Sequence, residues 1–176
     1  MKAILLIITL AASASCAVPT AVGTDFSEGQ MRFGARTAIA RSDATVDGSG
    51  YVLGNIFALD GGMFLTDQLE LGATAELYKS EYLGQANAQL FTGFARYYLQ
   101  SEGNVRPFVL IGAGLYNAKD GVGDVYRLGA GVSQFISDKT SLEISIEEQF
   151  SSYVTDFDVK AESDATTVYL GVNILL

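Results

Sequence analysis

Acidic residues at strand-like spacing are the first candidates for chemistry in this 176-residue sequence. Glu143 and Glu147 lie four residues apart in an alternating apolar and polar stretch, so an extended strand presents both on one face. Two carboxylates on one face can act as general acid and base. The pair Glu147 and Glu148 cannot act on one substrate, because adjacent strand residues point in opposite directions.

Arginines occupy the same kind of position, in the middle of a segment and on its polar face. Ion pairing with them competes with catalysis, and we favour it because a buried charge needs a partner. Four positive and four negative groups interleaved with Gly and Ser are typical of a self-compensating interior. The predicted charge network consists of Arg32, Arg36, Glu70, Glu76, Arg96, Arg127, Glu143 and Glu147.

Other catalytic or ligand-binding motifs are missing from the sequence. It contains no His, which excludes His-dependent hydrolase sites and His metal sites. The pairs Gly112-x-Gly114 and Gly129-x-Gly131 lie within expected strands, so they are not phosphate-binding loops. Acidic loops could bind Ca²⁺ or Mg²⁺, but no spacing resembles a calcium loop. We therefore expect no enzymatic activity, no cofactor and no metal.

Alternation with a period of two dominates the segments that carry these charges. Residues 61–78 form one alternating run, a polar turn at Thr66, Asp67 and Gln68, and a second run, which predicts a β-hairpin. Residues 135–139 repeat the turn design. Asn55 breaks the apolar face of its segment and suggests a bulge. Eight strands are predicted, at 30–41, 51–65, 68–79, 87–100, 106–116, 125–136, 139–152 and 165–176.

The placement of lysine indicates which strand face is outside. A water-soluble barrel shows many Lys and Glu on its strands, whereas here the lysines beyond the first segment lie at strand ends, turns or loops: Lys79, Lys119, Lys139 and Lys160. The apolar face suits lipid, and aromatic residues near strand ends could form interface girdles: Tyr51, Tyr97, Tyr116, Tyr126 and Phe150. We therefore predict an all-β, eight-stranded, antiparallel, up-and-down transmembrane β-barrel. A soluble lipocalin-like barrel or sandwich is the alternative.

The first residues have the pattern of a secretory signal peptide: one Lys, an apolar run and small residues. Cleavage after Ala14 or Ala17 fits, while lipidation of Cys16, the sole cysteine, is the alternative. The expected organisation is a signal peptide at 1–17, an exposed N-terminal lead-in at 18–28 and the barrel at 29–176. The net charge of −9 argues against nucleic acid as a partner.

Three stretches carry a resemblance to a known family: GMFLTDQLELG at 62–72, FARYYLQSEGNVRPFV at 94–109 and GAGVSQFISDKTSLE at 129–143. The chain resembles the small outer-membrane β-barrels of Gram-negative bacteria, the group around the OmpA transmembrane domain, OmpX and the opacity proteins. The resemblance implies an outer-membrane location. It also implies an assembly signal, read by the barrel-assembly machinery, at Tyr169, Gly171, Ile174 and Leu176.

The expected function follows from this architecture. We expect a monomer with a structural, envelope-integrity or adhesin-like role through its acidic loops, in contact with outer-membrane lipid and lipopolysaccharide. Basic residues near the outer loops, which could touch lipid phosphates, are Arg41, Lys79, Lys119 and Lys160. A narrow gated pore and a lipid-modifying enzyme are the alternatives.

Overall fold

The computed structural model describes residues 26–44, 50–80, 86–100, 103–118, 121–155 and 160–176. The predicted signal peptide, most of the lead-in and parts of five connections between strands lie outside these residues. The side chains of Arg41, Tyr51, Lys79, Lys119 and Lys160 are also outside the description. No helix in the described residues is long and apolar enough to cross a bilayer.

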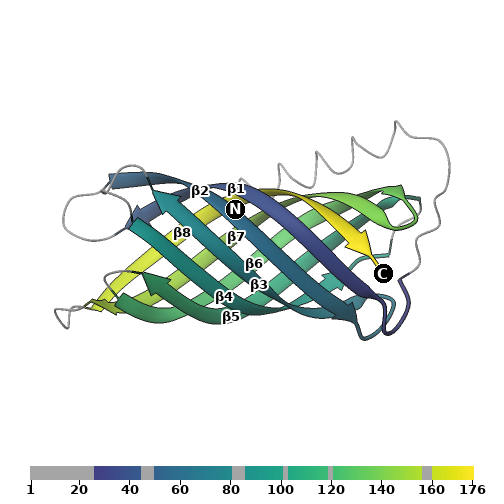
Figure 1. Ribbon diagram of the computed structural model, residues 1–176, viewed down its shortest axis with the longest axis horizontal. Helices are drawn as coiled ribbons and strands as arrows, with labels where there is room; N and C mark the ends of the chain where they lie inside the picture. Colours follow the sequence, from purple (N-terminus) through teal and green to yellow (C-terminus); the bar gives the residue numbers. More distant parts are fainter. Residues whose placement is uncertain (1–25, 45–49, 81–85, 101–102, 119–120, 156–159) are drawn as a thin grey trace.

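The chain forms a closed barrel in which each strand pairs antiparallel with its neighbours in sequence and β1 pairs with β8 (Figure 1). This confirms the predicted eight-stranded up-and-down architecture. Closure leaves no strand edge, which a sheet in lipid cannot tolerate. The strands are β1 (Met31–Ala44), β2 (Gly50–Phe64), β3 (Leu69–Ser80), β4 (Ala86–Tyr98), β5 (Val105–Ala118), β6 (Gly121–Ser137), β7 (Thr140–Thr155) and β8 (Lys160–Leu175).

The strand register gives the barrel its tilt. Following paired residues once around the barrel from Arg32 returns to β1 at Ser42, ten residues further along the strand. An eight-stranded barrel with such an offset has strands tilted by roughly 40° and an interior just wide enough for side chains. The tilt is visible in Figure 1. The lumen is therefore a packed core.

Polarity is inverted relative to a water-soluble barrel. The outer face carries exposed apolar side chains on every strand, among them Phe33, Leu59, Leu71, Phe91, Ile111, Leu128, Ile144 and Leu170. The inner face carries nine buried charged side chains, whereas Asp124, Glu162 and Asp164 are exposed near the loop end. Three of the predicted girdle residues, Tyr97, Tyr126 and Phe150, are exposed on the outer face. Tyr116 was assigned wrongly, because it is in register with the buried Leu90 and shares the inner face.

Strand ends and irregularities differ in detail from the prediction. Every strand extends further towards the loops than alternation indicated, and four do so by three residues or more; β6, for example, begins at Gly121 and β8 at Lys160. These extensions are rich in Gly, Ser and charged residues. They pair through backbone hydrogen bonds, although their side chains do not form an apolar face. The bulge expected at Asn55 is absent, since this residue pairs regularly with Ile39 and Lys79. The register shifts between Phe135 and Ser137 instead.

Figure 1 shows the C-terminus and the turns after β2, β4 and β6 at one end of the barrel. Phe26 closes this end, where it packs in a buried cluster with Phe64, Tyr98 and Phe135. Phe26 is 5% exposed and stacks on Phe64 with ring centroids 4.1 Å apart. Gly29, with φ of 83°, turns the chain, and its N–H donates to the Phe64 carbonyl at 2.8 Å. Within the lead-in, Ser27 and Glu28 are exposed as expected, but Phe26 is not.

Glycines on the inner face allow neighbouring strands to approach. A Cβ at Gly114 would collide with the backbone of β4, at the Phe91 carbonyl oxygen and the Thr92 Cα. We expect Gly114→Ala to lower the free energy of unfolding by about 1–3 kcal/mol, because the strands must separate. Gly93→Ala is the matched control: its Cβ faces outward, with no heavy atom nearer than 3.9 Å. Urea unfolding in detergent, followed by gel mobility, measures both, and equal stabilities would contradict the prediction.

Candidate functional site

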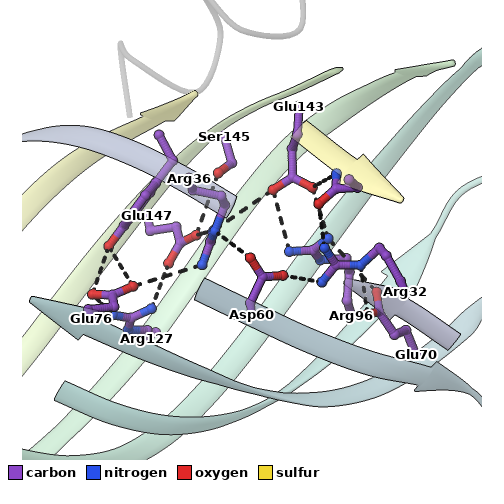
Figure 2. Close-up of polar contacts among 12 residues, drawn as sticks. Arg32, Arg36, Asp60, Glu70, Glu76, Arg96, Arg127, Glu143, Ser145 and Glu147 are labelled. Atoms are coloured by element: carbon purple, nitrogen blue, oxygen red, sulfur yellow. Dashed lines mark hydrogen bonds and ion pairs between the residues drawn. The ribbon is translucent and has the colours of Figure 1, made fainter. Parts of the chain in front are cut away.

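The lumen brings together all eight residues of the predicted charge network. They come from β1, β3, β4, β6 and β7, and each is at most 5% exposed. Because every second residue of a strand points inward, these side chains lie one above another along the lumen, between the two ends of the barrel. Figure 2 shows their contacts. The network also contains Asp60 from β2, which the sequence analysis left out.

Arg32 anchors the part of the network nearest the closed end. Its Nε donates to Glu70 Oε1 at 2.8 Å, and its two terminal nitrogens donate to Asp60 and Asn173. Three strands other than β1 thus contribute to the coordination of one guanidinium. The arrangement satisfies the requirement that a buried charge be paired and hydrogen-bonded.

Arg96 is held by Glu143 and by aromatic rings. Its Nη1 donates to Glu143 Oε2 at 2.9 Å and to the Tyr98 hydroxyl at 3.1 Å. The same hydroxyl donates to Glu70 Oε2 at 3.1 Å. The Arg96 guanidinium also lies 4.4 Å from the centroid of the Phe108 ring, within range of a cation–π interaction. This arginine therefore joins the ionic network to the aromatic cluster that fills the closed end.

Arg36 is the centre of the network (Figure 2). Its Nη1 donates to Glu147 at 2.6 Å, and its Nε lies 3.2 Å from Asp60. Glu143 and Glu76 are within 3.8 and 3.9 Å of its terminal nitrogens. One guanidinium is therefore shared among four carboxylates that come from β2, β3 and β7.

Arg127 and Glu76 form the part of the network nearest the loop end. Arg127 pairs with Glu76 and lies 3.4 Å from Glu147. The Tyr169 hydroxyl donates to Glu76 at 3.1 Å and accepts from Gln149 Nε2 at 2.8 Å. The Gln149 carboxamide oxygen in turn accepts from Tyr78 at 2.7 Å. A chain of neutral polar groups thus caps the ionic network on this side.

This arrangement leaves no carboxylate of the network free to act as an acid or base. Glu143 and Glu147, the candidate catalytic pair, are each bound to an arginine, at 2.9 and 2.6 Å. Glu147 and Glu148 face opposite sides of the sheet, as predicted. Among the described residues, no group of three or more Cys, His or acidic side chains could hold a metal ion. The lumen therefore supports ion pairing between packed side chains.

Several lumen residues could have been found by the same alternation that revealed the others. Asp60 lies on the inward-facing side of its strand. Ile56 and Ala58 share that side, so the sequence alone made the side look apolar. Tyr169 was assigned only to the assembly signal, yet it is fully buried. Of that signal, Tyr169 and Gly171 face the lumen and Ile174 and Leu176 face outward. Their role in assembly stays a prediction.

Known structures show where this architecture occurs. Comparison of the sequence with protein-family models and with curated proteins finds no match. Comparison of the fold finds neisserial surface protein A, with a TM-score of 0.70, 14% identity and coverage of 84% of this chain and 99% of that one. The chain has the fold of the small outer-membrane β-barrels. The apolar outer surface of this outer-membrane barrel fold agrees with the expected location.

Two further outer-membrane barrels of this fold differ in what they do. The attachment invasion locus protein Ail of Yersinia pestis has a TM-score of 0.54 and 13% identity, covering 85% of this chain and 99% of that one. The outer-membrane enzyme PagL has a TM-score of 0.57 and 12% identity, covering 77% of this chain and 97% of that one. The fold is therefore compatible with an enzyme and with a non-enzymatic surface protein.

Proposed function

We propose that the chain is a non-enzymatic, non-conducting outer-membrane barrel that supports the envelope and presents its acidic loops for surface interactions. One observation carries this proposal: nine charged side chains from six strands occupy the lumen and are paired with one another. The aromatic cluster around Phe26 fills one end of the same lumen. A lumen filled by side chains in this way favours a structural role over the transport of solutes through the barrel.

The loop end supplies the surface that would make the interactions. The chain has 20 acidic and 11 basic residues, and the acidic Asp124, Glu162 and Asp164 are exposed beside the loops. In outer-membrane barrels the longer loops are extracellular and the short turns periplasmic. The partners we propose are outer-membrane lipid and lipopolysaccharide, with the barrel-assembly machinery acting during insertion.

A narrow gated pore is the second candidate, and the surroundings of Arg36 favour it. Four carboxylates lie within 4 Å of this guanidinium, so it could exchange partners without becoming unpaired. Such an exchange could open a passage along the lumen wall. The pore and the sealed barrel make opposite predictions for conductance.

Recordings from planar bilayers separate these functions. We expect the refolded wild-type protein to show no steady conductance above leak, because the lumen is filled. Regular openings whose frequency changes in the Arg36→Lys variant would establish the pore and reject the sealed barrel. Turnover of labelled phospholipid or lipopolysaccharide by the same preparation would reject the non-enzymatic assignment. A heat-modifiability gel on each sample verifies that the barrel is folded.

A further inference from the structure

Glu148 is an acidic residue on the surface of the barrel that faces lipid. Its neighbour Glu147 is buried in the lumen, while Glu148 lies on the outer face of β7 and is partly exposed. The next outer row towards the turn end is aliphatic, with Ile146 in register with Ala130 and Val168. An ionised group beside hydrocarbon is unfavourable unless it has a partner, so ionisable residues within a membrane span are candidates for functional contacts.

The Glu148 carboxylate is only partly satisfied within the chain. Thr166 Oγ1 of β8 lies 3.0 Å from each of its oxygens and donates to it. A hydroxyl is neutral and donates one hydrogen, whereas an ionised carboxylate has about four acceptor sites. Within the described part of the chain, Thr166 is its sole hydrogen-bond partner. Acceptor sites therefore remain for a positively charged donor that approaches from the lipid.

Two exposed aromatic rings lie beside this carboxylate on the side of the loops. Phe150 is the next outward residue of β7, and Tyr126 of β6 is in register with Phe150. The two rings are 47% and 58% exposed, so both are accessible from the membrane. Diagonal and next-but-one positions on one face of a sheet are roughly 7 Å apart, a gap that one small cation can bridge. Aromatic faces attract cations, and more strongly where water is displaced.

The tilt of the strands brings these three groups to similar depths in the membrane. Two residues along a strand tilted by roughly 40° place Phe150 roughly 5 Å nearer the loop end than Glu148. The ten-residue offset around the barrel means that a paired residue on the preceding strand lies roughly 3 Å lower. Tyr126 therefore lies between Glu148 and Phe150 in depth. The next outer positions, Asp124 and Ser152, are polar, so the three groups lie at the edge of the apolar surface, where headgroups begin.

We propose that Glu148, Tyr126 and Phe150 bind the primary ammonium group of a phospholipid headgroup. The carboxylate supplies the opposite charge and accepts N–H bonds, and the rings add cation–π attraction from the side of the loops. An ethanolamine headgroup has the N–H donors that this site requires, whereas a choline headgroup has none. The site narrows the lipid contact proposed above to one headgroup, and it rests on that function only for the position of the barrel in a bilayer. Conductance through the lumen would reject the sealed barrel and leave this site unaffected.

Competition between two lipids tests the site in the wild-type protein. The barrel is refolded into vesicles of equal parts phosphatidylethanolamine and phosphatidylcholine and extracted in mild detergent, and native mass spectrometry then identifies the lipid that each barrel retains. We expect phosphatidylethanolamine to be enriched about tenfold over phosphatidylcholine, because a hydrogen bond to a charged group strengthens binding by about that factor. Equal retention of the two lipids would overturn the proposal.

Substitutions show which groups make the selection. Glu148→Gln keeps the size of the side chain and removes its charge, so we expect the preference for phosphatidylethanolamine to disappear. Replacing both Tyr126 and Phe150 with Leu should weaken the preference at least about twofold. Asp124→Asn is the matched control: it removes one charge from an exposed position on the same outer face, nearer the loops, and should keep the preference.

A heat-modifiability gel verifies that each variant is folded. A folded Glu148→Gln barrel that still selects phosphatidylethanolamine would overturn the proposal. Loss of the preference in Asp124→Asn as well would mean that surface charge in general attracts the headgroup, and it would also overturn the site.

Discussion

Replacing Arg36 with Met is expected to lower the free energy of unfolding by about 3–5 kcal/mol, the largest loss among the single substitutions considered. Removal of this guanidinium leaves the buried carboxylates of Glu147 and Asp60 without their contacts to it at 2.6 and 3.2 Å. The stability is lost because these carboxylates stay buried without a compensating positive charge. Urea titration in detergent micelles, read by the mobility of folded and unfolded forms, measures it.

Two further variants show that the loss comes from burial and pairing. Lys139→Met also removes one positive charge, but at an exposed turn, and should change the free energy of unfolding by less than about 0.5 kcal/mol. Combining Arg36→Met with Glu147→Gln neutralises one of the abandoned carboxylates. The double variant should therefore recover part of the loss, with a coupling of about 0.5–3 kcal/mol. Strictly additive effects would mean that the two residues do not interact.

Replacing Phe26 with Ala is expected to release the N-terminal segment from the closed end of the barrel. The ring stacks on Phe64 and lies 4.6 Å from the ring centroid of Tyr98, so truncation leaves a cavity beside both. Deleting a buried Phe ring costs about 3 kcal/mol or more. That loss corresponds to about a hundredfold larger open population, and cleavage by a Glu-specific protease after Glu28 should accelerate by a similar factor.

The matched control is Phe91→Ala, which removes a ring of the same size that is 56% exposed on the outer face. It should leave the rate of cleavage after Glu28 unchanged, because lipid or detergent fills the space. Mass spectrometry identifies the cleavage site. If Phe26→Ala and wild type were cut after Glu28 equally fast, the ring would not be holding this segment in place.

Much of the fold was predictable because the outer face of the barrel obeys a strict rule. Lipid tolerates few polar groups, so apolar residues recur at every second position, and Leu69, Leu71 and Leu77 reveal their strand without reference to neighbours. Beyond the lipid this rule ends. Gly121 and Lys160 begin strands that carry no apolar alternation there, and backbone pairing alone extends them. The end of an apolar pattern therefore underestimates strand length.

The charge network was predictable as a set of residues and not as a set of pairs. Alternation shows that Arg36 and Glu147 face inward, but their contact depends on the strand offset around the whole barrel, which no local pattern contains. Phe26 was missed for a related reason. It precedes the first strand and has no alternating neighbours, so nothing in the sequence distinguished it from an exposed linker.

The pairing of β1 with β8 constrains the way this chain can enter a membrane. Arg36 of β1 meets Glu143 and Glu147 of β7 only across a complete cylinder, because the two strands lie far apart in the chain. A partly inserted sheet that lacked β7 would carry the Arg36 guanidinium into hydrocarbon before two of its four carboxylate partners arrived. We therefore expect insertion to be concerted: the strands associate at the aqueous boundary first, and the whole cylinder then moves inward with its charges already paired.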